Sequence, residues 1–167
     1  LVAEGWRPLW VIDFPGFGWT DAATITYRDA NIDNDEFLEQ YYRMLTADDI
    51  DEFIAVHTEV NGVPLFSTIA TSSDGRAWYA DTSATDNGAI LLDGSDPRFE
   101  WVEEDGARDP GLVPAAEQPQ VERSDYVFNA NDSFWVPHAT ALLQGDYSPL
   151  HGRQETARSP RTRENAM

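Results

Sequence analysis

The chain has 167 residues, 41% of them hydrophobic and 12% aromatic, which is enough for one domain with a sizeable core. Thirty acidic residues against eleven basic residues give a formal net charge of −19, which repels phosphate backbones and anionic membrane surfaces. We therefore expect neither nucleic acid nor a membrane as a partner. Because the chain has no cysteine, it cannot form disulfides, thiolate metal sites or a cysteine nucleophile.

Both ends of the sequence are apolar or helix-like rather than polar. Leu1 opens directly into aromatic sequence, and Met167 closes a stretch with helical character. The sequence contains neither a signal-peptide pattern nor an apolar run long enough to span a membrane. We therefore expect residues 1–167 to be a single partial domain from the interior of a longer protein.

Two short strands are predicted near the start of the chain. Residues 8–14 contain a short apolar run, which a Pro-Gly-Phe-Gly turn ends at residues 15–18. Residues 22–28 are rich in threonine, isoleucine and tyrosine, which favour strands.

A first helix is predicted from the spacing of Phe37, Tyr41 and Leu45, which fall on one helical face. Asp33 and Glu36 are three residues apart at the expected start of this helix. This spacing resembles a capping box, in which the two side chains satisfy free backbone N–H groups.

A second helix is predicted directly after the first. Thr46, followed three residues later by Asp49, makes a plausible cap, and Gly62 is well placed to end the helix. The apolar stripe of this helix contains Ile50, Phe53, Ile54, His57 and Val60.

A β-hairpin follows, with strands at residues 66–72 and 76–82 around Ser73-Asp74-Gly75. A tight two-residue turn needs positive φ angles, which Asp-Gly adopts readily. Residues 84–120 are dense in Asp, Gly, Pro and Glu, so we expect long loops with short strands at 89–92 and 99–102.

The last part of the chain predicts a strand over residues 126–133 that runs into a polar terminus. Residues 154–165 have helical character that Pro160 is expected to break. Strands, two adjacent helices, a hairpin and long loops together predict an α+β fold rather than an alternating α/β fold.

One pattern resembles the start of an EF-hand calcium loop: Asp29, Asn31 and Asp33 alternate along the chain. The sixth position is Asn34 instead of glycine, and the twelfth is Gln40 instead of a bidentate glutamate. A turn followed by a helix cap is therefore favoured over a calcium site.

The three histidines are His57, His138 and His151. His57 lies on the stripe of the second helix, where a structural histidine is usual, and the other two lie in Pro-containing loops. No serine has a G-x-S-x-G context, so a Ser-His-Asp triad within this chain has no support.

A third candidate site is the polar segment 129–133, which contains Asn131 and precedes four arginines in the last fifteen residues. A side-chain amide at the end of a strand can donate a hydrogen bond to an oxyanion, and an arginine can hold it in place. The alternative is an ordinary turn, since Asn and Asp are common turn formers. The arginines are Arg153, Arg158, Arg161 and Arg163.

The segment 125–135, with its Asn-x-Asn-Asp-Ser-x-Trp pattern, resembles the penicillin acylase family, in the branch of the aculeacin and acyl-homoserine-lactone acylases. Residues 145–150 and 156–163 are similar to the same branch. Weaker similarities follow the family order upstream, at residues 17–21, 27–31, 62–64, 68–70, 75–81 and 92–95.

The resemblance implies an N-terminal-nucleophile hydrolase with a four-layer αββα fold, produced by autocatalytic cleavage of a precursor. A serine at the new N-terminus attacks an amide carbonyl, and its own α-amine is the base. The resemblance implies that Asn131 is the oxyanion donor. It implies that Arg158 supports Asn131, with Arg161 as the second choice. It also implies that Trp19 lines the acyl pocket.

The resemblance also implies partners and a compartment. The substrate would be a small-molecule N-acyl amide, and the chain would be an interior part of the large (β) subunit of an acylase heterodimer, located in the periplasm or outside the cell. The nucleophilic serine is absent, so this piece alone should be inactive. No cofactor is expected, and no ligands for the family's structural calcium are identified here. The rival hypothesis is an acidic, β-rich binding module without catalysis.

Overall fold

The computed structural model describes residues 10–11, 21, 26–27, 31, 34–83 and 112–167. The described part contains helices and an antiparallel three-stranded sheet, which fits the predicted α+β class. The expected strands at 89–92 and 99–102 lie outside the described residues. Near the start of the chain, β1 (Trp10–Val11) pairs antiparallel with β2 (Thr26–Tyr27), within the two segments expected to be strands.

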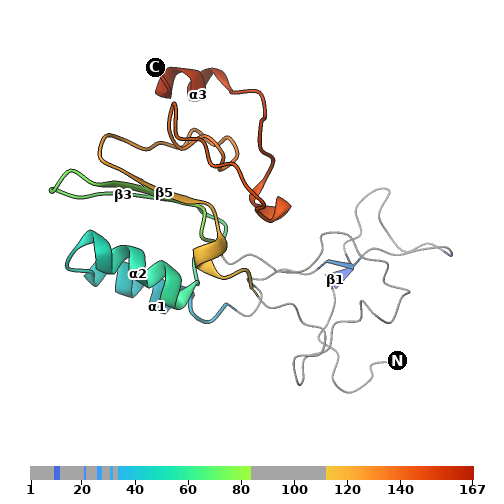
Figure 1. Ribbon diagram of the computed structural model, residues 1–167. Coiled ribbons are helices and arrows are strands. Elements are labelled where there is room, and N and C mark those ends of the chain that lie inside the picture. The colour runs from blue at the N-terminus through green and yellow to red at the C-terminus, as the bar shows by residue number, and fades with distance from the viewer. Residues whose placement is uncertain (1–9, 12–20, 22–25, 28–30, 32–33, 84–111) are drawn as a thin grey trace.

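The three-stranded sheet is the middle layer of the described part. Its order is β3 (Thr68–Thr71), β4 (Ala77–Ala80) and β5 (Gln120–Arg123), and both pairings are antiparallel. Figure 1 shows α1 and α2 on one side of this sheet, and the chain after β5, which ends in α3, on the other side. We call residues 124–167 the C-terminal arm.

The central strand β4 is buried on both faces because side chains alternate along a strand. Trp78 packs on the helix side with Ile50 of α2. Tyr79 packs on the other side with Phe134 and Trp135 of the C-terminal arm. The two halves of the core are therefore joined through adjacent residues of a single strand.

The two adjacent helices are confirmed as α1 (Phe37–Thr46) and α2 (Ile50–Val60), which contact each other. The predicted caps are wrong in detail. The residue before α1 is Glu36, which makes no capping hydrogen bond. The cap of α2 is Asp49, whose carboxylate accepts the Glu52 N–H at 2.8 Å, because Thr46 is still the last residue of α1.

The end of α2 also differs by one residue from the prediction. Asn61 adopts the left-handed conformation (φ 54°) and donates its N–H to the His57 carbonyl at 3.2 Å. Gly62 comes next, and its N–H donates to Gln40 Oε1 at 3.1 Å. A Cβ on Gly62 would approach the backbone of Glu36 to 2.9 Å, so a glycine is needed for this close approach.

The predicted apolar face of α1 is largely uncovered in the described part. Phe37 and Leu45 of this face are 41% and 85% exposed. Leu38 and Tyr42, which lie beside it, are 71% and 68% exposed. The buried residue of α1 is Gln40, whose side chain is tied to the end of α2. Hydrophobic spacing correctly predicted this helix but did not predict which side of it faces the described core.

The hairpin is confirmed, and its loop occupies the predicted residues 73–75, although it is a three-residue loop and not a two-residue turn. The Ser72 N–H donates to the Arg76 carbonyl at 3.0 Å, which leaves residues 73–75 as a three-residue loop. Within this loop, positive φ occurs only at Gly75 (90°). Beyond the turn, the Arg76 guanidinium is 2.7 Å from Asp51 and 2.8 Å from Glu122, and so links α2 to β5.

Three features of the second half differ from the sequence prediction. Strand β5 was not predicted, because it borders the loop-like acidic segment. Residues 126–133 form no strand; instead the Phe128 N–H donates to the Pro137 carbonyl at 2.8 Å, within the C-terminal arm itself. Pro160 begins α3 (Pro160–Asn165) instead of breaking a helix, because proline lacks only an N–H that a first helical residue does not use.

Within the described residues, no helix is both long and apolar enough to cross a membrane.

His57 gives a pH prediction for this core. It is 1% exposed, its Nδ1 donates to the Phe53 carbonyl at 3.0 Å, and burial lowers its pKa. Below a pH of about 6.5, His57 binds a proton in the unfolded chain, whereas the buried ring of the folded chain stays neutral to lower pH. The free energy of unfolding should therefore decrease as the pH falls. Thermal unfolding of the complete protein at pH 7.5 and 5.5 should show a smaller acid loss for His57→Gln than for the wild type. An equal loss in both would contradict this role.

Candidate functional site

The segment 129–133 forms a turn rather than a strand end. Asn131 has φ of 64°, a left-handed conformation that asparagine tolerates better than most residues. Its N–H donates to Asn129 Oδ1 at 2.8 Å, a hydrogen bond that mimics a backbone turn. Asn131 is exposed, whereas Ala130 beside it is buried. The turn is thus anchored by the buried Ala130, and the side-chain amide of Asn131 faces outward.

The next residue, Asp132, ties this turn to the start of α3. Its Oδ2 accepts the Ser159 N–H at 3.1 Å and also accepts the Thr162 hydroxyl hydrogen. The hydrogen bond from Thr162 is the main cause of a lowered pKa at Asp132. The carboxylate is therefore charged at neutral pH, and the tie weakens only when the pH falls below the usual aspartate value of about 3.9.

Because α3 is tied to the turn, Arg161 reaches Asn131. Arg161 Nη2 donates to Asn131 Oδ1 at 3.1 Å. A guanidinium can only donate, so the atom it meets must be the amide oxygen. The amide nitrogen of Asn131 then carries two N–H donors, for which the described part of the chain provides no acceptor. This arrangement leaves one oriented, neutral donor pair beside a positive charge.

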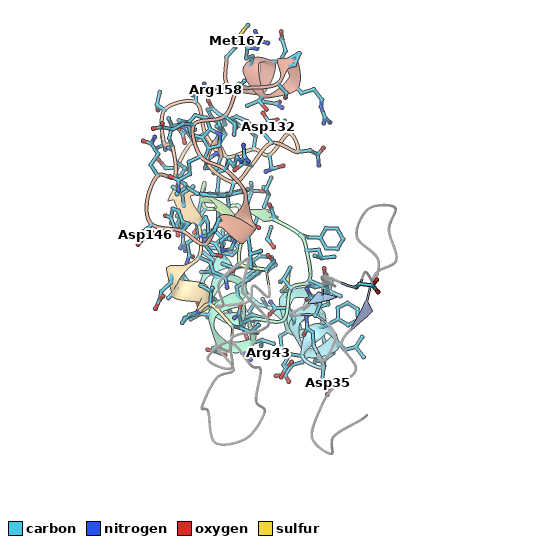
Figure 2. The ribbon with its side chains drawn as sticks, turned by 90° about the vertical axis from the view of Figure 1, so that its right-hand side faces the viewer. Asp35, Arg43, Asp132, Asp146, Arg158 and Met167 are labelled. Atoms are coloured by element: carbon cyan, nitrogen blue, oxygen red, sulfur yellow. The ribbon has the colours of Figure 1, made fainter. Side chains whose placement is uncertain are left out.

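Arg158, the first choice from the family resemblance, lies elsewhere. Its guanidinium carbon is 5.9 Å from the centroid of the Trp135 ring, a cation–π distance. Trp135 Nε1 in turn donates to Thr156 Oγ1 at 3.0 Å. Figure 2 shows Arg158 and Asp132 at the same end of the molecule as Met167. The structure thus pairs Asn131 with Arg161 and not with Arg158, while Trp19 lies outside the described residues.

The histidines are structural or paired, and none contacts Asn131 within the described part. His57 belongs to the core between α2 and β3, as expected. His138 Nδ1 accepts the Thr140 and Ala141 N–H groups at 3.1 and 3.2 Å. His151 Nδ1 lies 3.2 Å from Asp81 Oδ2, which joins the C-terminal arm to the end of β4.

A cavity of about 250 Å³ adjoins the turn. Its polar lining includes Asp81, Asp132, Ser133 and His151. Ligand pockets usually measure roughly 300–1,000 Å³. The cavity that the described residues form is therefore somewhat smaller than a usual ligand pocket.

Two contacts at this site could not be predicted from the sequence. Asn129 Nδ2 lies 3.4 Å from the hydroxyl of Tyr79, which is 50 residues away along the chain. His151 and Asp81 are 70 residues apart. Asp81 could have been singled out because it is a polar residue at the end of a buried strand. No local pattern, however, indicates that its partner is His151.

The structure contains no metal site within its described residues: none of their His, Asp and Glu side chains form a group of three suited to a metal ion. Two residues of the calcium-like pattern, Asp29 and Asp33, lie outside the description. Asn31 Oδ1 accepts a hydrogen bond from Asn34 Nδ2 at 3.1 Å, and the same Nδ2 donates to the Gly62 carbonyl at 2.9 Å. These contacts fit the turn interpretation of this segment.

The family model and the relatives that cover most of the chain indicate one family. The family model described as penicillin amidase matches residues 11–166. The acyl-homoserine lactone acylase PvdQ of Pseudomonas savastanoi pv. phaseolicola is 34% identical over 157 residues, covering 84% of this chain and 20% of that protein. The aculeacin-A acylase of Actinoplanes utahensis is 30% identical over 171 residues, covering 89% of this chain and 22% of that protein.

The match is thus to a family of amide-hydrolysing acylases. The chain belongs to the penicillin amidase family, and the resemblance seen in the sequence is confirmed. The chain spans about a fifth of the length of the curated relatives it matches.

The Asp132 tie predicts a local loss of structure when it is removed. Asp132→Ala leaves the Ser159 N–H and the Thr162 hydroxyl without their acceptor, which should cost about 1–3 kcal/mol. Hydrogen exchange of the complete protein should then be faster across residues 159–166. Asp146→Ala is the matched control, because Asp146 is exposed and has no partner among the described residues. Unchanged exchange in Asp132→Ala would show that α3 is held by other contacts.

Proposed function

We propose that this chain is an interior part of the nucleophile-bearing subunit of an acylase that hydrolyses the amide bond of a small-molecule N-acyl substrate. In this proposal Asn131 donates a hydrogen bond to the carbonyl oxygen as it becomes negatively charged, and Arg161 holds Asn131 in place. The observation that carries the proposal is the hydrogen bond from Arg161 to Asn131 Oδ1, at 3.1 Å. The two N–H groups of the Asn131 side chain remain available to another acceptor.

The chemistry of this pair suits an oxyanion. A preorganised donor stabilises charge that develops in the transition state without having to reorient. The amide is already oriented by the Asn129 hydrogen bond to its backbone and by Arg161 on its oxygen. The charge of the arginine also adds positive potential near the amide.

The rest of the reaction is proposed from the family. A serine at the N-terminus of the mature subunit would attack the carbonyl, with its own α-amine as base, and expel the amine of the substrate. Water would then hydrolyse the acyl-serine. This requires the remainder of an αββα heterodimer made by autocatalytic cleavage, in the periplasm or outside the cell, with Trp19 in the acyl pocket. The names of the relatives suggest acyl-homoserine lactones and aculeacin A as substrates to test.

Asn131→Ala in the complete enzyme should reduce kcat by roughly 10²–10³, the usual loss for one oxyanion donor. KM should change much less, because the donor acts mainly on the transition state. Steady-state hydrolysis of an N-acyl-homoserine lactone and of a chromogenic N-acyl amide measures both values. A complete protein that hydrolyses neither substrate in its wild-type form would favour the binding-module hypothesis.

The arginines provide a second, comparative prediction. Arg161→Ala should reduce kcat by about 10-fold or more, since it removes a charge-assisted hydrogen bond to Asn131. Arg163→Ala is the matched control, because Arg163 is exposed on the same helix and has no partner among the described residues. Arg158→Ala should affect stability more than turnover, through its contact with Trp135. A larger loss of kcat for Arg158→Ala than for Arg161→Ala would reverse the assignment.

A further inference from the structure

We propose that Tyr79 is a positioning residue, whose buried hydroxyl fixes the side chain of Asn129 and thereby the orientation of Asn131. This inference rests on the proposed function of Asn131. It assigns a role in turnover to a residue of the sheet core that lies 52 positions before Asn131 in the sequence.

The position of Tyr79 makes its hydroxyl a fixed point. Tyr79 lies in the central strand β4, is 0% exposed and belongs to the core cluster with Phe134 and Trp135. Its hydroxyl oxygen lies 3.4 Å from Asn129 Nδ2 and 3.3 Å from Ser67 Oγ. Because Tyr79 is fixed in the sheet, its contact with Asn129 fixes the 129–133 turn relative to the sheet.

The hydrogen bond between Asn129 and Tyr79 can have only one direction. An amide nitrogen can only donate, so the Tyr79 oxygen accepts from Asn129. Between the Tyr79 hydroxyl and Ser67 Oγ, which are 3.3 Å apart, either oxygen can be the donor. Burial raises the pKa of Tyr79 to about 12, so the hydroxyl keeps its hydrogen at neutral pH.

The other end of the Asn129 amide completes the chain of contacts. Asn129 Oδ1 accepts the Asn131 N–H at 2.8 Å, so the Asn129 amide is oriented from both ends. A second contact of Asn129 Nδ2, to the Asp132 carbonyl at 3.5 Å, lies within the turn itself and does not connect it to the sheet. In the described part, Tyr79 is therefore the link from this amide to the sheet.

The backbone of Asn131 explains why this link matters. A φ of 64° is sparsely populated for a residue other than glycine and persists where surrounding contacts impose it. If Asn129 can rotate, its oxygen no longer fixes the Asn131 N–H, and Asn131 can leave the left-handed conformation. Its side chain would then move relative to Arg161 and to the substrate carbonyl.

Tyr79→Phe in the complete enzyme tests the proposal. It removes only the hydroxyl, and we expect kcat to fall by about 3- to 10-fold with KM changed by less than about 2-fold. Tyr147→Phe is the matched control, because Tyr147 packs against the same core cluster and its hydroxyl has no hydrogen-bond partner among the described residues. Its kcat should stay at the wild-type value.

A double-mutant cycle distinguishes positioning from a general loss of stability. In an Asn131→Ala background, Tyr79→Phe should lower kcat no further, because its effect passes through Asn131. An additional loss of the same size in that background, or an unchanged kcat in the single variant, would overturn the proposal. If Tyr79→Phe does not fold, Asn129→Ala, at a half-buried position in the turn, replaces it in the same cycle.

The outcome also separates this inference from the proposed function. If Asn131→Ala lowers kcat but Tyr79→Phe does not, the inference fails and the proposed function remains. If Asn131→Ala leaves kcat unchanged, both fail together.

Discussion

The carboxylate of Asp132 is the contact on which the arrangement at the C-terminal end depends. It accepts hydrogen bonds from the first turn of α3 while its own backbone forms part of the 129–133 turn. Because the Asp132 side chain is hydrogen-bonded to α3 and its backbone lies in the turn, the helix cannot shift without moving the turn. The distance between Asn131 and Arg161 is therefore set by Asp132 as much as by the two residues that meet.

The sheet provides the second constraint, through two neighbouring side chains of β4. Trp78 fixes the helical layer and Tyr79 fixes the C-terminal arm, so both layers take their position from the same strand. The surface of α1 that carries Leu38 and Leu45 is apolar and exposed, which fits a layer that packs against further protein.

Features encoded by neighbouring residues could be predicted from the sequence, and features encoded by distant contacts could not. The hairpin depends on Gly75 and its flanking strands, so its signal is local and the prediction is confirmed. Pro160 was misjudged because proline either ends or begins a helix, and only the cap at Ser159 decides between the two. The pairing with Arg161 instead of Arg158 depends on the position of α3, which spacing along the chain does not determine.

The pair formed by Asn131 and Arg161 also has a consequence for the order of folding. The two residues are 30 positions apart, and no single turn or helix brings them together. Closing a loop of that length costs entropy, which is recovered only once the intervening segment has docked on the sheet. A newly made chain therefore lacks this pair until its tertiary structure is complete. Any self-cleavage that relied on the pair would be delayed until then, and an unfinished chain would be protected from premature cutting.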